Sequence, residues 1–67
     1  MKKKIYIDGM SCEHCVKRVE KTLNSIEGLK NVKVKIGLAE VETSSDINDL
    51  VFKNSIEDIG YDVTKIE

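Results

Sequence analysis

The fold of this chain is decided around Gly9-Met10-Ser11-Cys12-Glu13-His14-Cys15-Val16, a stretch that holds both of its cysteines. The stretch follows a short alternating run, Ile5-Tyr6-Ile7, which is typical of a β-strand. It precedes apolar residues at three- and four-residue steps, the pattern of one helix face: Val16, Val19, Leu23 and Ile26. The sequence therefore predicts a loop between a strand and a helix, with the two cysteines at the helix start.

A β-hairpin is expected over residues 32–43. Apolar residues alternate with lysines over 32–36, which indicates a half-buried strand. Residues 40–43 would form its antiparallel partner after a tight turn around 37–39. Gly28, ahead of the hairpin, is expected to end the first helix.

A polar break at residues 44–46 precedes a second helix. Asn48 is a favourable N-cap, and Asp49 suits the positive end of the helix dipole. Gly60 is expected to end this helix, and residues 61–66 offer a last strand. The order β-α-β-β-α-β predicts an α+β, ferredoxin-like sandwich, in which two helices cover one face of a four-stranded antiparallel sheet.

The chain's size and composition fit a single domain over residues 1–67, close to the smallest size that folds on a hydrophobic core. The net charge of -1 gives no reason to expect nucleic-acid binding. The apolar run behind Met1-Lys2-Lys3-Lys4 is too short for a signal peptide, and no stretch is long enough to insert into a membrane. We therefore expect a cytoplasmic protein with reduced thiols, which favours metal binding or redox chemistry over a structural disulfide.

Two thiols three positions apart suit one soft monovalent ion such as Cu(I), because the thiolate is a soft ligand. A helix N-terminus favours the thiolate, and the nearby positive charges would add to this effect: Lys17, Arg18 and Lys21. A closed zinc site normally needs four protein ligands, whereas this chain has two cysteines and one histidine. Asp8 or water could complete only an open zinc site. A partly exposed two-thiol site also allows an incoming thiolate to take over the metal.

Two other interpretations of the cysteines carry less weight. C-x-x-C also occurs in dithiol oxidoreductases, but those rely on a proline beside the active site, and this chain has none. Cysteines that only fill the core are disfavoured by polar neighbours, which mark a loop: Ser11, Glu13 and His14.

Four neighbouring residues are candidates for supporting the cysteine loop. Gly9 would allow the backbone turn, and Met10 would either bind copper or pack under the loop, with packing favoured. His14 is expected to face solvent in the monomer. Tyr61 would either shield the site with its hydroxyl near the sulfurs or pack at a strand edge.

The lysines of the sequence suggest a basic docking patch or a solvated face, and the solvated face is favoured. Glu40 and Glu42 would then pair with them across the sheet. The lysines concerned are Lys2, Lys3, Lys4, Lys30, Lys33 and Lys35.

Two segments together carry a family resemblance. Residues 9–15 match G-M-x-C-x-x-C, and Ile56-Glu57-Asp58-Ile59-Gly60-Tyr61 matches I-E-x-x-G-Y. Over essentially its whole length the chain resembles the heavy-metal-associated domain family. It is most similar to the family's small bacterial copper chaperones, which Ser11, His14 and the Gly60-Tyr61 pair fit. The hairpin is shorter than is usual in the family, and Ser55 stands where a small apolar residue is common.

The resemblance implies a βαββαβ fold and Cu(I) ligation by Cys12 and Cys15. It implies a non-enzymatic carrier that delivers Cu(I) to the metal-binding domain of a copper-transporting P-type ATPase or to a copper-responsive repressor. It also implies that Tyr61 lies near the metal, and that a monomeric apo protein can pair through a bridging copper, with His14 a candidate at the contact. A regulatory domain of a transporter and a carrier of Hg, Cd or Zn stay open as alternatives.

Overall fold

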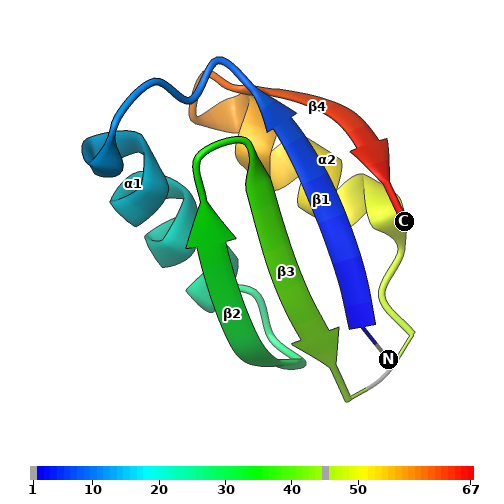
Figure 1. Cartoon of the computed structure of the whole chain (residues 1–67). Helices are drawn as coiled ribbons and strands as arrows, with labels where there is room; N and C mark the ends of the chain where they lie inside the picture. Colours follow the sequence, from blue (N-terminus) through cyan, green and yellow to red (C-terminus); the bar gives the residue numbers. More distant parts are fainter. Residues whose placement is uncertain (1, 45) are drawn as a thin grey trace.

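The computed structural model describes residues 2–44 and 46–67, so Met1 and Ser45 of the expected polar break lie outside the described residues. Its elements follow the predicted βαββαβ order (Figure 1). They are β1 (Lys2–Asp8), α1 (Glu13–Asn24), β2 (Leu29–Lys35), β3 (Leu38–Thr43), α2 (Asp49–Asp58) and β4 (Asp62–Ile66).

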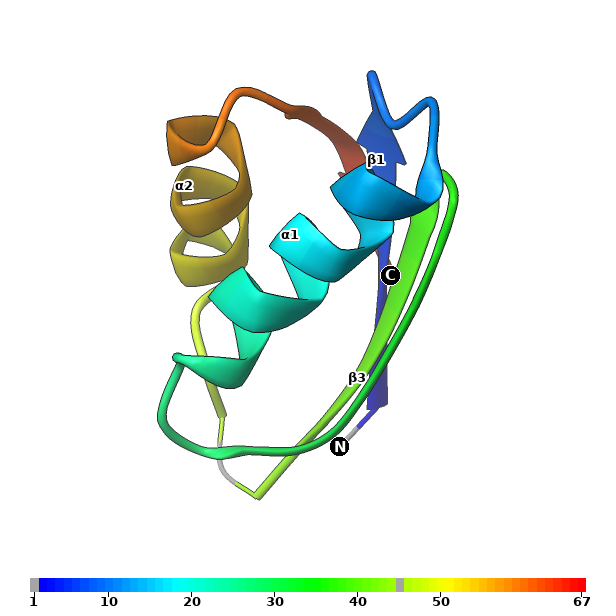
Figure 2. The same cartoon turned by 90° about the vertical axis from the view of Figure 1, so that its left-hand side faces the viewer.

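The four strands form one sheet in the order β2-β3-β1-β4, and every neighbouring pair is antiparallel. Figure 2 shows both helices on the same face of this sheet. The architecture confirms the predicted ferredoxin-like sandwich. Between β1 and β4 the register shifts after Tyr6, where the Thr64 hydroxyl donates to the Tyr6 carbonyl at 3.3 Å.

The core lies between the sheet and the helices, as the hydrophobic periodicity predicts. Alternate residues of β1 and β3 supply the sheet side, and single stripes of α1 and α2 supply the helix side. The buried members from these four elements are Ile5, Ile7, Ala39, Val41, Val19, Leu23, Phe52 and Ile56. Burial of these side chains is the main source of stability, because removal of apolar area from water is the dominant favourable term in folding.

Several predicted boundaries are wrong by a few residues, among them the start of the hairpin, which begins at Leu29 instead of residue 32. The first helix ends at Asn24, before Gly28, in a tighter turn: the Ser25 and Ile26 N–H groups donate to the Thr22 and Leu23 carbonyls at 3.2 and 3.0 Å. The hairpin turn is Ile36-Gly37, one residue earlier than expected, since Lys35 and Leu38 already face each other in the sheet. Leu38 and Ala39, placed in the turn from the sequence, are therefore strand residues.

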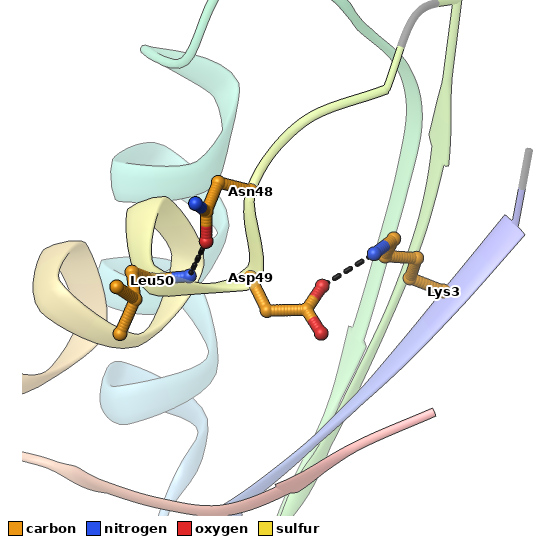
Figure 3. Close-up of polar contacts among 4 residues, drawn as sticks. All are labelled: Lys3, Asn48, Asp49 and Leu50. Carbon is orange, nitrogen blue, oxygen red and sulfur yellow. Dashed lines mark hydrogen bonds and ion pairs between the residues drawn. The ribbon is translucent and has the colours of Figure 1, made fainter.

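The start of α2 is tied to the start of β1 (Figure 3). The Asn48 side chain accepts a hydrogen bond from the Leu50 N–H at 2.9 Å, so Asn48 is the N-cap that the sequence predicts. Asp49, in the first turn, forms an ion pair with Lys3 of β1. These contacts close the end of the sandwich that lies opposite the cysteine loop.

The open face of the sheet carries Lys2, Lys4 and Lys33 in register with glutamates. Glu40 of β3 lies opposite Lys33 of β2 on one side and opposite Lys4 of β1 on the other. Glu42 lies opposite Lys2 and accepts a hydrogen bond from Asn31 at 2.9 Å, which lowers its pKa. This alternation is the arrangement that a solvated face predicts.

None of the helices among residues 2–44 and 46–67 has the length and apolar character needed to span a membrane.

Candidate functional site

Three connections come together at one end of the sandwich (Figure 1): the loop from β1 to α1, the turn from β2 to β3, and the segment from α2 to β4. The Ile7 N–H at the end of β1 donates to the Gly37 carbonyl of the turn at 2.9 Å. The antiparallel topology brings these segments together because β1 ends where β3 and β4 begin. Cys12 lies at the end of the loop from β1 to α1, and Cys15 lies in the helix turn that follows it.

Cys12 occupies the N-cap position of α1, and Cys15 lies in the first turn of the helix. The Cys12 carbonyl accepts the N–H groups of Cys15 and Val16, at 3.1 and 3.4 Å. This turn brings the two Sγ atoms to 3.8 Å from each other. Both residues carry free thiols, with Cys12 exposed and Cys15 half-buried.

The pKa of Cys15 is lowered to about 7, chiefly by a hydrogen bond with the Tyr61 side chain. Hydrogen bonds with the backbone of Ser11 and Cys12 and with the Cys12 side chain lower it further, while burial opposes the shift. The same contact raises the pKa of Tyr61, since the hydroxyl acts as the donor toward the thiolate. Within the described residues the shift therefore comes from hydrogen bonds, and not from the positive charges on α1 that the sequence suggested.

Tyr61 reaches the thiols because of the way α2 ends. Gly60 has a positive φ of 99° and its N–H donates to the Glu57 carbonyl at 3.0 Å. The Tyr61 N–H donates to the Ile56 carbonyl at 3.4 Å. This pair of bonds is a Schellman motif, which requires a left-handed residue at the Gly60 position. It turns Tyr61 inward, where its side chain is 8% exposed.

Gly9 and Met10 shape the other side of the loop. Gly9 has a positive φ of 92°, a conformation that strains any residue with a side chain, and a Cβ there would lie 3.8 Å from Cδ1 of Tyr61. Met10 is 8% exposed and belongs to the core cluster. This is the position that the packing interpretation of Met10 predicts, and the buried side chain holds the loop against the sandwich.

The remaining candidates near the thiols are exposed, namely Asp8, Ser11 and His14. Among residues 2–44 and 46–67, no group of three His, Cys, Asp or Glu side chains is arranged to hold a metal ion. The site is thus a pair of thiols, with a tyrosine hydroxyl and backbone amides around Cys15. Such a pair can offer two soft ligands to one ion, since metal–thiolate bonds of about 2.3 Å, as in zinc sites, let sulfurs 3.8 Å apart reach the same ion.

One feature at this end was missed from the sequence: the exposure of Ile36, which the alternating pattern placed in a half-buried strand. The adjacent Gly37 was the available signal, because a two-residue turn with a positive φ at glycine starts the return strand early.

The fold and the two-thiol loop define a class of small metal-binding domains. The profile of the heavy-metal-associated domain matches residues 4–62, and the chain belongs to that family.

Within the family, three proteins show the kind of member that the chain is similar to. The chain is 39% identical over 66 residues to the copper chaperone CopZ of Bacillus subtilis, covering 94% of this chain and 96% of that protein. It superposes on a solved CopZ metallochaperone with a TM-score of 0.88 and 36% identity, covering 96% of this chain and 100% of the other. It also resembles the Cu(I)-loaded N-terminal domain of a potential copper-translocating P-type ATPase from Bacillus subtilis, with a TM-score of 0.80, 30% identity and coverage of 98% and 89%.

Proposed function

We propose that residues 1–67 act as one heavy-metal-associated domain, a cytoplasmic metallochaperone that carries Cu(I) without catalysing a reaction. Cys12 and Cys15 bind the ion. The carrier passes it by thiolate exchange to the metal-binding domain of a copper-transporting P-type ATPase or to a copper-responsive repressor. The observation that carries the proposal is the pair of free thiols with Sγ atoms 3.8 Å apart at the protein surface.

The choice of Cu(I) follows from the ligand set. Two thiolates satisfy a soft monovalent ion, whereas a structural zinc site takes four protein ligands. The described residues offer no third His, Cys, Asp or Glu to these thiols. The likeness to proteins named copper chaperones supports the same ion.

The environment of each sulfur suits transfer. Cys15 has a pKa of about 7, so a large part of it is thiolate at neutral pH before any metal arrives. Cys12 is exposed, so an incoming thiolate from an acceptor can approach an ion held there. A first acceptor thiolate joins Cys12 and Cys15 on the ion and Cys12 leaves, and a second acceptor thiolate then replaces Cys15, so the ion moves without being freed into solution. Tyr61 stays outside the ligand set and covers the Cys15 side of the site.

The test is a Cu(I) titration of the reduced protein against a competing chromophoric chelator, with Zn(II) run in parallel. We expect tight binding near one Cu(I) per chain, far stronger than zinc binding, and its loss in the variant that carries both Cys12→Ser and Cys15→Ser. Weak Cu(I) binding, or zinc binding that outcompetes it, would contradict the proposal and favour a carrier of another ion.

A further inference from the structure

β2 is an outermost strand of the sheet, and Figure 1 shows it at one edge of the molecule. The strand spans Leu29–Lys35 and pairs regularly with β3 from Asn31 onward. It carries three lysines and no acidic residue: Lys30, Lys33 and Lys35. The backbone N–H and C=O groups along an edge strand are a template for a further strand. The outer side of β2 is therefore a candidate surface for another chain.

β4, the strand at the other edge, is less suited to accept a further strand. It spans only Asp62–Ile66, and its register with β1 shifts between Tyr6 and Ile7. Its lysine, Lys65, is already held in an ion pair with Glu67 at 2.8 Å. Short and irregular edges of this kind are a common protection against strand pairing. The two edges therefore differ, and β2 is the one that offers a longer regular stretch.

The open face of the sheet carries charges that alternate from strand to strand and end at β2. Lys4 of β1, Glu40 of β3 and Lys33 of β2 lie in one row. Lys33 and Lys35 are both exposed, and Lys35 lies opposite Leu38 of β3 instead of opposite an acid. A further strand would continue the alternation if it placed one carboxylate beside each of these two lysines.

β3 shows which sequence pattern fits beside β2. Its Glu40 lies opposite Lys33, whereas its Val41 is buried on the helix side and lies opposite Val32. A strand on the outer side of β2 would meet the same two faces, with lysines on one and half-buried valines on the other. The fitting pattern is thus an acidic residue alternating with an apolar one.

We propose that the outer side of β2 binds an extended acidic segment of another protein as an added antiparallel strand. Carboxylates of that segment lie beside Lys33 and Lys35, and its apolar side chains extend the layer under the helices. In strand addition the backbone bonds supply affinity and the side chains select the sequence. The interaction does not use the thiols, so it goes beyond the proposed function.

The lysines also decide against a second copy of the chain as the occupant. Antiparallel pairing of two β2 strands would gather the lysines of both copies along one interface, and like charges opposite each other are destabilising. Lysine on an edge strand is a general protection against such pairing. The same charges that exclude a second β2 attract an acidic strand, which gives the edge its specificity.

The experiment titrates the reduced, metal-free protein with a capped peptide that repeats Glu-Val, and with a matched peptide that repeats Lys-Val. NMR chemical shifts measure binding, and amide hydrogen exchange shows whether β2 gains a neighbouring strand. The variant with Lys33→Glu and Lys35→Glu reverses the charge of the edge. The control variant carries Lys21→Glu and Lys53→Glu, the same change of charge on exposed lysines of the two helices. Thermal unfolding checks that each variant is folded.

The titrations are run at about 0.1 M salt, where charges more than about 10 Å apart are largely screened. We expect the Glu-Val peptide to slow amide exchange along β2 and to leave β4 unchanged. It should bind at least about tenfold more tightly than the Lys-Val peptide, the effect of two cross-strand charge pairs. The Lys33 and Lys35 variant should reverse this preference, and the control variant should bind like wild type.

Three results would overturn the inference. They are an absence of Glu-Val binding at millimolar concentration, binding that leaves amide exchange along β2 unchanged, and equal weakening of binding in the two variants. The comparison of the two peptides on the wild-type protein keeps the test valid if the edge variant fails to fold. None of these results alters the Cu(I) titration, so the proposed function is tested separately.

Discussion

The end of the sandwich where β1 and α2 begin is closed by polar side-chain contacts, whereas the end that carries the thiols is closed by apolar side chains and glycine turns. At the first end, Asn48 caps α2 and Lys3 pairs with Asp49. At the second end, Met10 and Tyr61 are buried. The Tyr61 hydroxyl there bonds to Cys15.

Because of this difference, side chains at the first end should affect mainly the free energy of unfolding, and the thiols at the second end should affect mainly metal binding. A side chain that only caps a helix or joins two elements can be lost with a cost in folding free energy and no change at the thiols. A thiol at the other end contributes little to the core, because Cys12 is exposed and Cys15 is half-buried. Variants at the first end should therefore lower stability without changing metal binding, and variants of the thiols should weaken metal binding without lowering stability.

The largest effect is expected from single replacement of a thiol. Cys12→Ser or Cys15→Ser should each weaken Cu(I) binding by more than about 100-fold. Loss of a residue that only supports a metal ligand weakens binding by up to about 100-fold, and here the ligand itself is removed. The unfolding midpoint of the apo protein should stay within a few degrees of wild type. Chelator competition and thermal denaturation check the two statements. An apo variant that fails to fold would show that the two ends are not separable in this way.

A smaller effect is expected from Tyr61→Phe. The variant keeps the buried ring but removes the hydroxyl that contributes most to lowering the pKa of Cys15 to about 7. The pKa should rise, so less thiolate is present at neutral pH, and alkylation of Cys15 by iodoacetamide at pH 7 should slow several-fold. At a pH above both pKa values the order should reverse, because both thiols are then ionised and the thiolate of higher pKa is the stronger nucleophile.

The control for this experiment is the pH profile of the alkylation rate in a Cys12→Ser background, which leaves one thiol to react. The midpoint for Cys15 should lie lower with Tyr61 present than with phenylalanine. Equal midpoints in the two proteins would contradict the role assigned to the hydroxyl.

The sequence predicted the elements well because hydrophobic periodicity reports directly on burial. Val19 and Leu23 were placed on a buried face by spacing alone, and they belong to the helix side of the core. Helix and hairpin ends were less predictable. They depend on single local hydrogen bonds, such as that of Ser25 to Thr22, which compete with the glycine signals on which the sequence argument relied.

The candidate site was predictable in part for a similar reason. The spacing of Cys12 and Cys15 places both in one turn at a helix start, so their proximity follows from local geometry. The contact between Tyr61 and Cys15 joins residues far apart in the sequence. It depends on the Schellman turn at Gly60 as well as on the topology, and the sequence left shielding and strand-edge packing equally open. The metal-binding roles of these residues stay predictions.

The opposite end of the molecule offers the smallest expected effect, from Asn48→Ala. The Asn48 side chain satisfies the Leu50 N–H, one of the N-terminal amides that has no partner within the helix. Loss of such a cap typically costs about 1 kcal/mol of unfolding free energy. Asn48→Asp is the matched control, because aspartate caps equally well and should restore most of the stability. Chemical denaturation measures the cost, and Cu(I) affinity should be the same in all three proteins, since the cap lies across the sandwich from the thiols. An Asn48→Ala variant with altered Cu(I) affinity would mean that the helix start and the cysteine loop are coupled through the core, and the division between the two ends would fail.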